Sequence, residues 1–93
     1  MATPEGKVKA QVKKWLDARG AWYFMPVSNG MGKMGVPDFI CCIRGLFLAI
    51  ETKAPGKLGA VTELQKHQIR EIVAAGGTAI VVDDVALLDA LDM

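Results

Sequence analysis

The sequence contains no long hydrophobic run, although 52% of its 93 residues are apolar. No stretch approaches the roughly 18 uncharged residues of a membrane span, and Glu5 followed by repeated lysines lacks the apolar core of a secretory signal. We therefore expect a cytoplasmic protein with no membrane partner. A chain of this length forms one compact domain but not two, so a single domain over residues 1–93 is expected to carry the whole function.

Cysteine and histidine are scarce, with two of the first and one of the second. Cys41 and Cys42 are adjacent, so in a strand their side chains point to opposite faces and do not bridge each other. We expect both to be reduced core residues. Their spacing matches no zinc pattern and His67 lies far away in the sequence, which excludes a Cys/His metal site.

A nucleotide-binding loop is also missing. The Gly-rich segment 30–35 lacks the Gly-Lys-Ser/Thr ending of a P-loop, so no nucleotide cofactor is expected. Two interpretations of this segment stay open. Its glycines let the loop adapt to a nucleic-acid backbone while Lys33 contacts phosphate, or it is a simple flexible connector.

Basic residues are absent from segment 71–93, which holds five acids. Residues 1–70 contain all 11 Lys and Arg against five acids, an excess of +6 in a chain of formal net charge +1. This polarity is typical of a phosphate-binding face, and an ordinary solvated surface is the alternative. The candidate phosphate contacts are Lys7, Lys9, Lys13, Lys14, Lys33, Lys57, Lys66 and Arg70.

Hydrophobic periodicity and turn residues predict the element order αβββαβα. The first helix begins at Thr3-Pro4 and ends at Gly20, the second begins after Thr62 and ends at Gly76, and Asp84 caps a short third one. Strands are predicted over 21–27, 39–43, 46–50 and 79–82, with 39–43 and 46–50 buried on both faces. The strand-helix-strand unit near the end implies a parallel pair. The fold class is therefore α/β, with a mixed four-stranded sheet flanked by helices.

The hairpin brings two acids together. If Arg44-Gly45 is a two-residue turn, Ile43 pairs with Leu46, and counting back places Asp38 opposite Glu51. Directly opposed carboxylates repel unless a cation compensates them, and carboxylate oxygens suit Mg²⁺ or Mn²⁺. Lys53, two residues after Glu51, projects from the same face and is placed to contact a phosphate or the attacking water.

Two further polar residues are candidates for the same corner. Glu5 falls on the interior-facing arc of the first helix. It either joins the site or is simply an N-terminal acid that the helix dipole favours. Gln65 falls on the apolar side of the second helix, so it either faces the site or is a core amide bonded to backbone. Singly, Asp38 is explained by turn chemistry and Glu51 and Lys53 by a solvated strand end. Their convergence on one corner of the sheet favours a site.

Gly35-Val36-Pro37-Asp38, followed thirteen residues later by Glu51-Thr52-Lys53, closely resembles the PD-(D/E)XK nuclease signature. Glu5 and the Leu-x-x-x-Thr-x-x-Gln arrangement over 58–65 are similar to the virus-type replication-repair nuclease (VRR-NUC) family within that superfamily. The resemblance implies a restriction-endonuclease-like core and Mg²⁺- or Mn²⁺-dependent phosphodiester hydrolysis. It implies that Asp38, Glu51, Glu5 and the Thr52 carbonyl bind metal, that Lys53 is catalytic, and that Gln65 completes the site.

The expected function is a structure-selective DNA endonuclease acting on branched DNA such as Holliday junctions. The resemblance implies a homodimer, because symmetric cleavage of a four-way junction needs two sites. Trp22, Phe24, Met31 and Met34 are candidate contacts, although core packing is the preferred interpretation for the two aromatics. A nickase or end-processing nuclease, a non-catalytic nucleic-acid-binding module and a small dimeric interaction protein are the alternatives.

Overall fold

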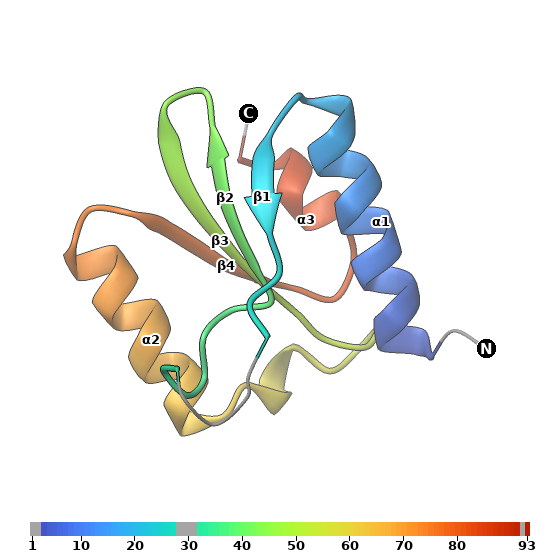
Figure 1. The fold of residues 1–93 in the computed structure, drawn as a ribbon. Helices are drawn as coiled ribbons and strands as arrows, with labels where there is room; N and C mark the ends of the chain where they lie inside the picture. The colour runs from blue at the N-terminus through green and yellow to red at the C-terminus, as the bar shows by residue number, and fades with distance from the viewer. Residues whose placement is uncertain (1–2, 28–31, 92) are drawn as a thin grey trace.

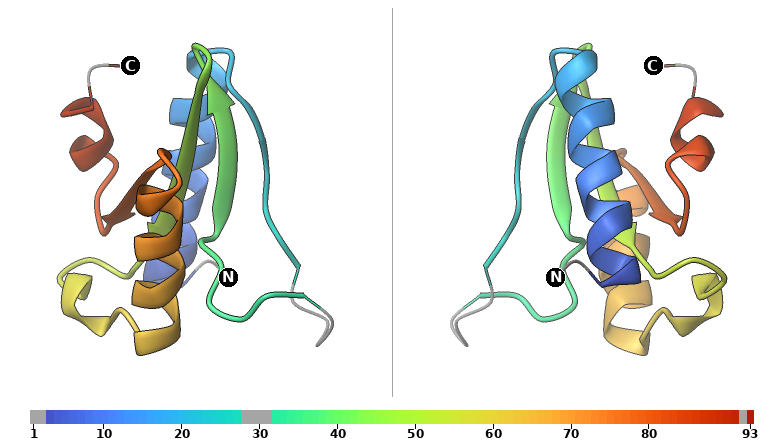
Figure 2. Two further views of the ribbon diagram at one scale, coloured as in Figure 1. Left: turned by 90° about the vertical axis from the view of Figure 1, so that its left-hand side faces the viewer. Right: turned by 90° about the vertical axis from the view of Figure 1, so that its right-hand side faces the viewer.

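A four-stranded sheet forms the centre of the molecule, seen here in a computed structural model that describes residues 3–27, 32–91 and 93. Helices α1 and α3 cover one face of the sheet, and α2 lies against the other face (Figures 1 and 2). The helices are α1 (Pro4–Ala18), α2 (Glu63–Ala74) and α3 (Ala86–Asp89), with a short 3₁₀ turn, η1 (Leu58–Ala60), before α2. The strands are β1 (Trp22–Phe24), β2 (Phe39–Ile43), β3 (Leu46–Thr52) and β4 (Thr78–Val82).

The sheet is mixed, in the order β1-β2-β3-β4. β1 with β2 and β2 with β3 are antiparallel, whereas β3 with β4 is parallel. The parallel pair follows from the α2 connection, because a crossover returns the chain to the same edge before the next strand begins. The predicted αβββαβα order and mixed sheet are therefore confirmed.

The hairpin between β2 and β3 has the predicted two-residue turn. Arg44 and Gly45 both have positive φ, 51° and 78°, as a type I′ turn requires. Ile43 pairs with Leu46, and the ladder runs in register to Phe39 opposite Ile50. This register was predicted from the count of residues alone.

The two long helices begin as their capping residues predict. The Thr3 hydroxyl accepts a hydrogen bond from Gly6 N at 3.0 Å, and Pro4 takes the first helical position. At α2, Thr62 and Gln65 form a capping box, in which each side chain bonds the other residue's backbone N–H. α3 is short, and its start is supported by the Asp84 carboxylate, which accepts from Ala86 N at 2.8 Å.

The hydrophobic core lies between α1 and the sheet. Val8, Val12, Trp15 and Leu16 of α1 are buried, as their helical spacing predicted, and pack with buried residues of β2, β3, β4 and α3. α3 is tied to α1 through Trp15 Nε1, which donates to Asp89 at 2.9 Å. No helix in the described part of the chain is long and apolar enough to cross a membrane.

The prediction that 39–43 and 46–50 are buried on both faces holds for Leu48, Ala49 and Ile50 of β3, but it is wrong for β2 and for the start of β3, where Leu46 and Phe47 are exposed. α2 packs against β4, so on that face of the sheet no helix of the described residues covers β1 and β2. Cys42 is therefore exposed, while Cys41 on the other face is buried, and only one cysteine belongs to the core. The preference for core packing of the aromatics is also wrong, since Trp22 is 65% and Phe24 47% exposed.

Candidate active site

The predicted acids and lysine meet where β2 begins, β3 ends and α2 begins. Asp38 directly precedes Phe39, the first residue of β2, whose partner is Ile50. Continuing that register by one residue puts Asp38 beside Glu51, the next residue of β3. Lys53 follows the last residue of β3, and its backbone N–H is held by Val82 O at 2.8 Å.

Glu51 is the most deeply buried acid of this corner, with only 3% of its surface exposed. Its Oε2 accepts a hydrogen bond from Gln65 Nε2 at 3.1 Å and lies 3.6 Å from Lys53 Nζ. Its Oε1 is buried and has no hydrogen-bond partner among residues 3–27, 32–91 and 93. Burial first, and then the negative charges of Asp38 and Glu5, raise the pKa of Glu51 to about 7, while Lys53 opposes part of the rise.

Asp38 is held by Thr52. Asp38 Oδ2 accepts from Thr52 N at 3.0 Å and from the Thr52 hydroxyl, while Thr52 itself is fully buried. The Asp38 carboxylate is thus turned toward Thr52, yet its charge still acts on Glu51. Sequence reasoning assigned only the Thr52 carbonyl and missed this hydroxyl, because alternation along β3 indicates that Thr52 points away from Glu51.

Gln65 joins the acid to the lysine. Its Oε1 accepts from Lys53 Nζ at 3.0 Å and from Thr62 N at 2.9 Å, and its Nε2 donates to Glu51. Because Thr62 N and the lysine ammonium only donate, the amide oxygen must face them and the NH₂ group must face the carboxylate. Of the two interpretations of Gln65, the structure places it facing the acid and lysine, and the same amide also caps α2.

Glu5 lies at the start of α1 and is only partly buried. Its carboxylate pairs with Lys9 at 3.3 Å, and its side chain is 41% exposed. It is near enough for its charge to raise the pKa of Glu51. The structure thus joins Glu51, Lys53 and Gln65 through hydrogen bonds and an ion pair, and it leaves Asp38, which bonds Thr52, and Glu5 near enough for their charges to act on Glu51.

The donor set suits a hard divalent cation. The buried Oε1 of Glu51 is an acceptor with no donor in the described part of the chain, and a second carboxylate lies near it. Within residues 3–27, 32–91 and 93, no three or more His, Cys, Asp or Glu side chains gather closely enough to form a complete cage. Mg²⁺ is commonly bound by one or two carboxylates, with water and substrate phosphate completing the shell, so the two acids fit such an ion.

The predicted phosphate contacts lie on the surface. Lys33, Lys57, Lys7 and Lys14 are exposed, as are Lys13 and Arg70. Lys66 pairs with Glu63 at 3.4 Å. Lys7 also borders a hollow of about 350 Å³ beside Pro55, Asp83 and Asp84, and Asp83 accepts from Gly56 N at 2.9 Å.

Of the predicted dimer contacts, Met34 is 57% exposed, and Met31 lies outside the described residues.

Comparison with solved structures finds similarity to a protein described as a "VRR_NUC domain". The TM-score is 0.72 and the sequence identity 27%, over 98% of this chain and 96% of the other. No protein-family profile matches the sequence, and no curated protein does. The chain therefore has the fold of a VRR-NUC domain, as the motif resemblance predicted, and is nuclease-like in architecture.

Proposed function

We propose that this chain, with its VRR-NUC fold, is a divalent-metal-dependent DNA endonuclease whose active site is the corner formed by Asp38, Glu51, Lys53 and Gln65. The observation that supports it is the buried Glu51 carboxylate, one oxygen of which accepts no hydrogen bond from any described residue, with a second acid and a lysine near it. A purely structural role leaves this arrangement unexplained, because a buried charge without full compensation destabilises the fold. Functional sites are where such a cost is tolerated.

The two acids and the Thr52 carbonyl would hold Mg²⁺ or Mn²⁺, with Glu5 as an outer carboxylate. When bound, the cation supplies Lewis-acid stabilisation of the charge that develops on a phosphate undergoing hydrolysis. Lys53 contributes a fixed positive charge at the same corner. Its Nζ is oriented by Gln65, and its side chain is 12% exposed, so the lysine is largely shielded from water yet not fully buried.

Lys53→Ala tests this mechanism. Cleavage of DNA in Mg²⁺ or Mn²⁺ should fall by at least a hundredfold, because the lysine stabilises charge only in the transition state, whereas DNA affinity should be largely kept. Lys13→Ala, which removes one exposed charge from α1, is the matched control and should cut at the parental rate with saturating DNA. Undiminished cleavage by Lys53→Ala would remove the mechanism.

Branched DNA is the proposed substrate, since two sites related by a two-fold axis suit a four-way junction. Junctions, flaps and linear duplexes are assayed side by side with each metal. Faster cutting of the junction supports the proposal. Equal cutting of all three substrates rejects junction preference and leaves a nickase or end-processing nuclease.

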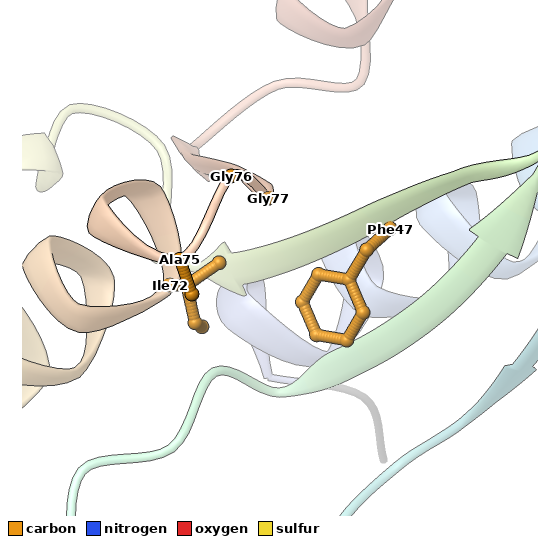
Figure 3. A pocket seen from close by; sticks show the side chains of 5 residues that line it. All are labelled: Phe47, Ile72, Ala75, Gly76 and Gly77. Atoms are coloured by element: carbon orange, nitrogen blue, oxygen red, sulfur yellow. The ribbon is translucent and has the colours of Figure 1, made fainter.

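We propose that the second site comes from a second copy of the chain, bound through the uncovered part of the sheet. Trp22, Cys42 and Phe47, all exposed, form one cross-strand row there; in the next row Phe24 is exposed and Ile40 half-buried, and the row ends at the buried Ala49. Neither row contains a charged residue, so the surface does not suit a phosphate backbone. Beside it, Phe47 and Ile72 line a hollow of about 340 Å³ that continues the apolar surface toward α2 (Figure 3).

The area is adequate for the centre of an interface. The residues Trp22, Phe24 and Phe47 are 65%, 47% and 45% exposed. With 150–250 Å² for a fully exposed aromatic, they leave roughly 300 Å² of apolar ring surface in water. A stable interface buries about 800 Å² per partner, with its apolar part at the centre, so three rings and their surroundings suffice.

Sedimentation velocity separates the outcomes. The parent chain should sediment as a dimer and Trp22→Glu as a monomer, because a buried carboxylate at the centre of the interface has no partner. Leu87→Glu, on α3 at the opposite side of the sheet, is the control and should stay dimeric. A parent that remains monomeric at about 100 µM, well above a micromolar Kd, would reject this surface as a dimer interface.

A further inference from the structure

The segment before Asp38 rests on the same turn of α2 that supports Glu51 and Lys53. Gly35, three residues before Asp38, has φ +76° and approaches the peptide bond between Leu64 and Gln65. A Cβ added at Gly35 would lie 2.6 Å from the Leu64 carbonyl carbon and 2.9 Å from Gln65 N. No side chain fits there without moving backbone.

One turn further along α2, Gln68 makes a second attachment. Its Nε2 donates to Met34 O at 3.1 Å, so the residue before Gly35 is bonded to the helix as well. Pro37, between Gly35 and Asp38, is buried. The main chain entering Asp38 is therefore fixed at two neighbouring points on α2.

Asp38 needs such a support because it stands outside the strand ladder, which begins at Phe39. Its carboxylate is held by Thr52, but that bond forms only if the backbone delivers the side chain to the end of β3. Gln65, on the turn that Gly35 touches, bonds Glu51 and Lys53. The first turn of α2 thus contacts Gly35, in the segment that leads to Asp38, and also carries Gln65, which bonds Glu51.

We propose that Gly35 and Gln68 are positioning residues, which clamp the segment 34–37 onto α2 and so set the place of Asp38 relative to Glu51. The clamp sets the separation of the two acids that a divalent cation has to span. This assignment rests on the proposed function, and it concerns residues that touch neither metal nor substrate.

Gly35→Ala is the direct test, and Gly20→Ala is its matched control. Both glycines have positive φ, +76° and +67°, but nothing lies within 4 Å of a Cβ at Gly20. Backbone strain is therefore common to both variants, and only Gly35→Ala pushes the segment off α2. Where Gly35→Ala fails to fold, Gln68→Met removes the second attachment alone, and Gln68→Lys, which keeps an N–H donor, should restore it.

The first readout is hydrogen exchange of the Thr52 amide by NMR in metal-free buffer, with the Leu48 amide in the same strand as reference. Gly35→Ala, or Gln68→Met in its place, should speed Thr52 exchange at least tenfold while Gly20→Ala does not, because Thr52 N loses the Asp38 acceptor. The second readout is Mn²⁺ affinity by calorimetry, which should weaken about tenfold in the same variants.

The outcomes are separable. Equal Thr52 exchange and equal Mn²⁺ affinity in the Gly35→Ala and Gly20→Ala variants would overturn the clamp, whether or not the parent cuts DNA. A parent that binds no metal and cuts no DNA would reject the proposed function, and the Thr52 amide would still decide whether Gly35 and Gln68 place Asp38.

Discussion

The ionisation of Glu51 opposes folding when no cation is bound. Burial is the main reason that the pKa of this carboxyl rises from 4.5 to about 7. The folded chain therefore binds a proton more tightly than the unfolded chain does, so the free energy of unfolding falls as pH rises from about 4.5 through about 7. At about 1.4 kcal/mol for each pH unit, the penalty is roughly 3 kcal/mol at pH 8 and absent below pH 4.5.

Glu51→Gln should remove this penalty. The amide has the shape of the carboxyl, its oxygen still accepts from Gln65 Nε2, and it carries no charge at any pH. In EDTA at pH 8 the variant should be about 3 kcal/mol more stable than the parent, and the difference should shrink toward zero near pH 4.5. Urea unfolding at several pH values measures this difference. The variant should also lose DNA cleavage.

Glu63→Gln, an exposed carboxyl on α2 that pairs with a lysine, is the control, and its pH curve between pH 4.5 and 8 should follow that of the parent. If the proposed site binds Mg²⁺ in the folded chain, the cation should stabilise the parent and should leave Glu51→Gln unchanged. A Glu51→Gln protein that is no more stable than the parent at pH 8, or one whose advantage does not vary with pH, would refute the reasoning.

Thiol reactivity should divide the two cysteines. Burial raises the pKa of Cys41 to about 12, whereas Cys42 is exposed, so native protein should react with one equivalent of a disulfide reagent and unfolded protein with two; rapid native reaction of both thiols would contradict the assignment of faces. Leu16→Ala, at a fully buried position of α1, should cost about 2–5 kcal/mol in chemical denaturation. Leu64→Ala, at a site 52% exposed, should cost less than about 1 kcal/mol, and comparable losses would contradict the burial pattern.

Local rules accounted for much of the fold. The two residues of Arg44-Gly45 predicted the turn, and the turn determined the register that brings Asp38 to Glu51. Thr62 and Gln65 predicted the start of α2, since a capping box needs only residues three apart. These features depend on short-range geometry, so they can be predicted from letters close together in the chain.

Exposure was less predictable. Trp22, Phe24 and Cys42 have the composition of core strands, and nothing near them in the sequence says which part of a sheet face a helix will cover. Their exposure depends on where α2 packs, and α2 comes later in the chain than β1 and β2, the strands that it leaves uncovered. The interpretation of these residues as core was wrong for this reason.

The sequence by itself determined the order of elements, the hairpin register and the identity of the acids and lysine that share one corner. Only the tertiary structure decided how those groups are held. Thr52 donates to Asp38, Gln65 bonds both Glu51 and Lys53, and Gly35 packs against the first turn of α2. The physical reason is range. Hydrogen bonds between side chains and close backbone approaches form only when separate elements pack to within about 3 Å, and no local propensity sets that distance.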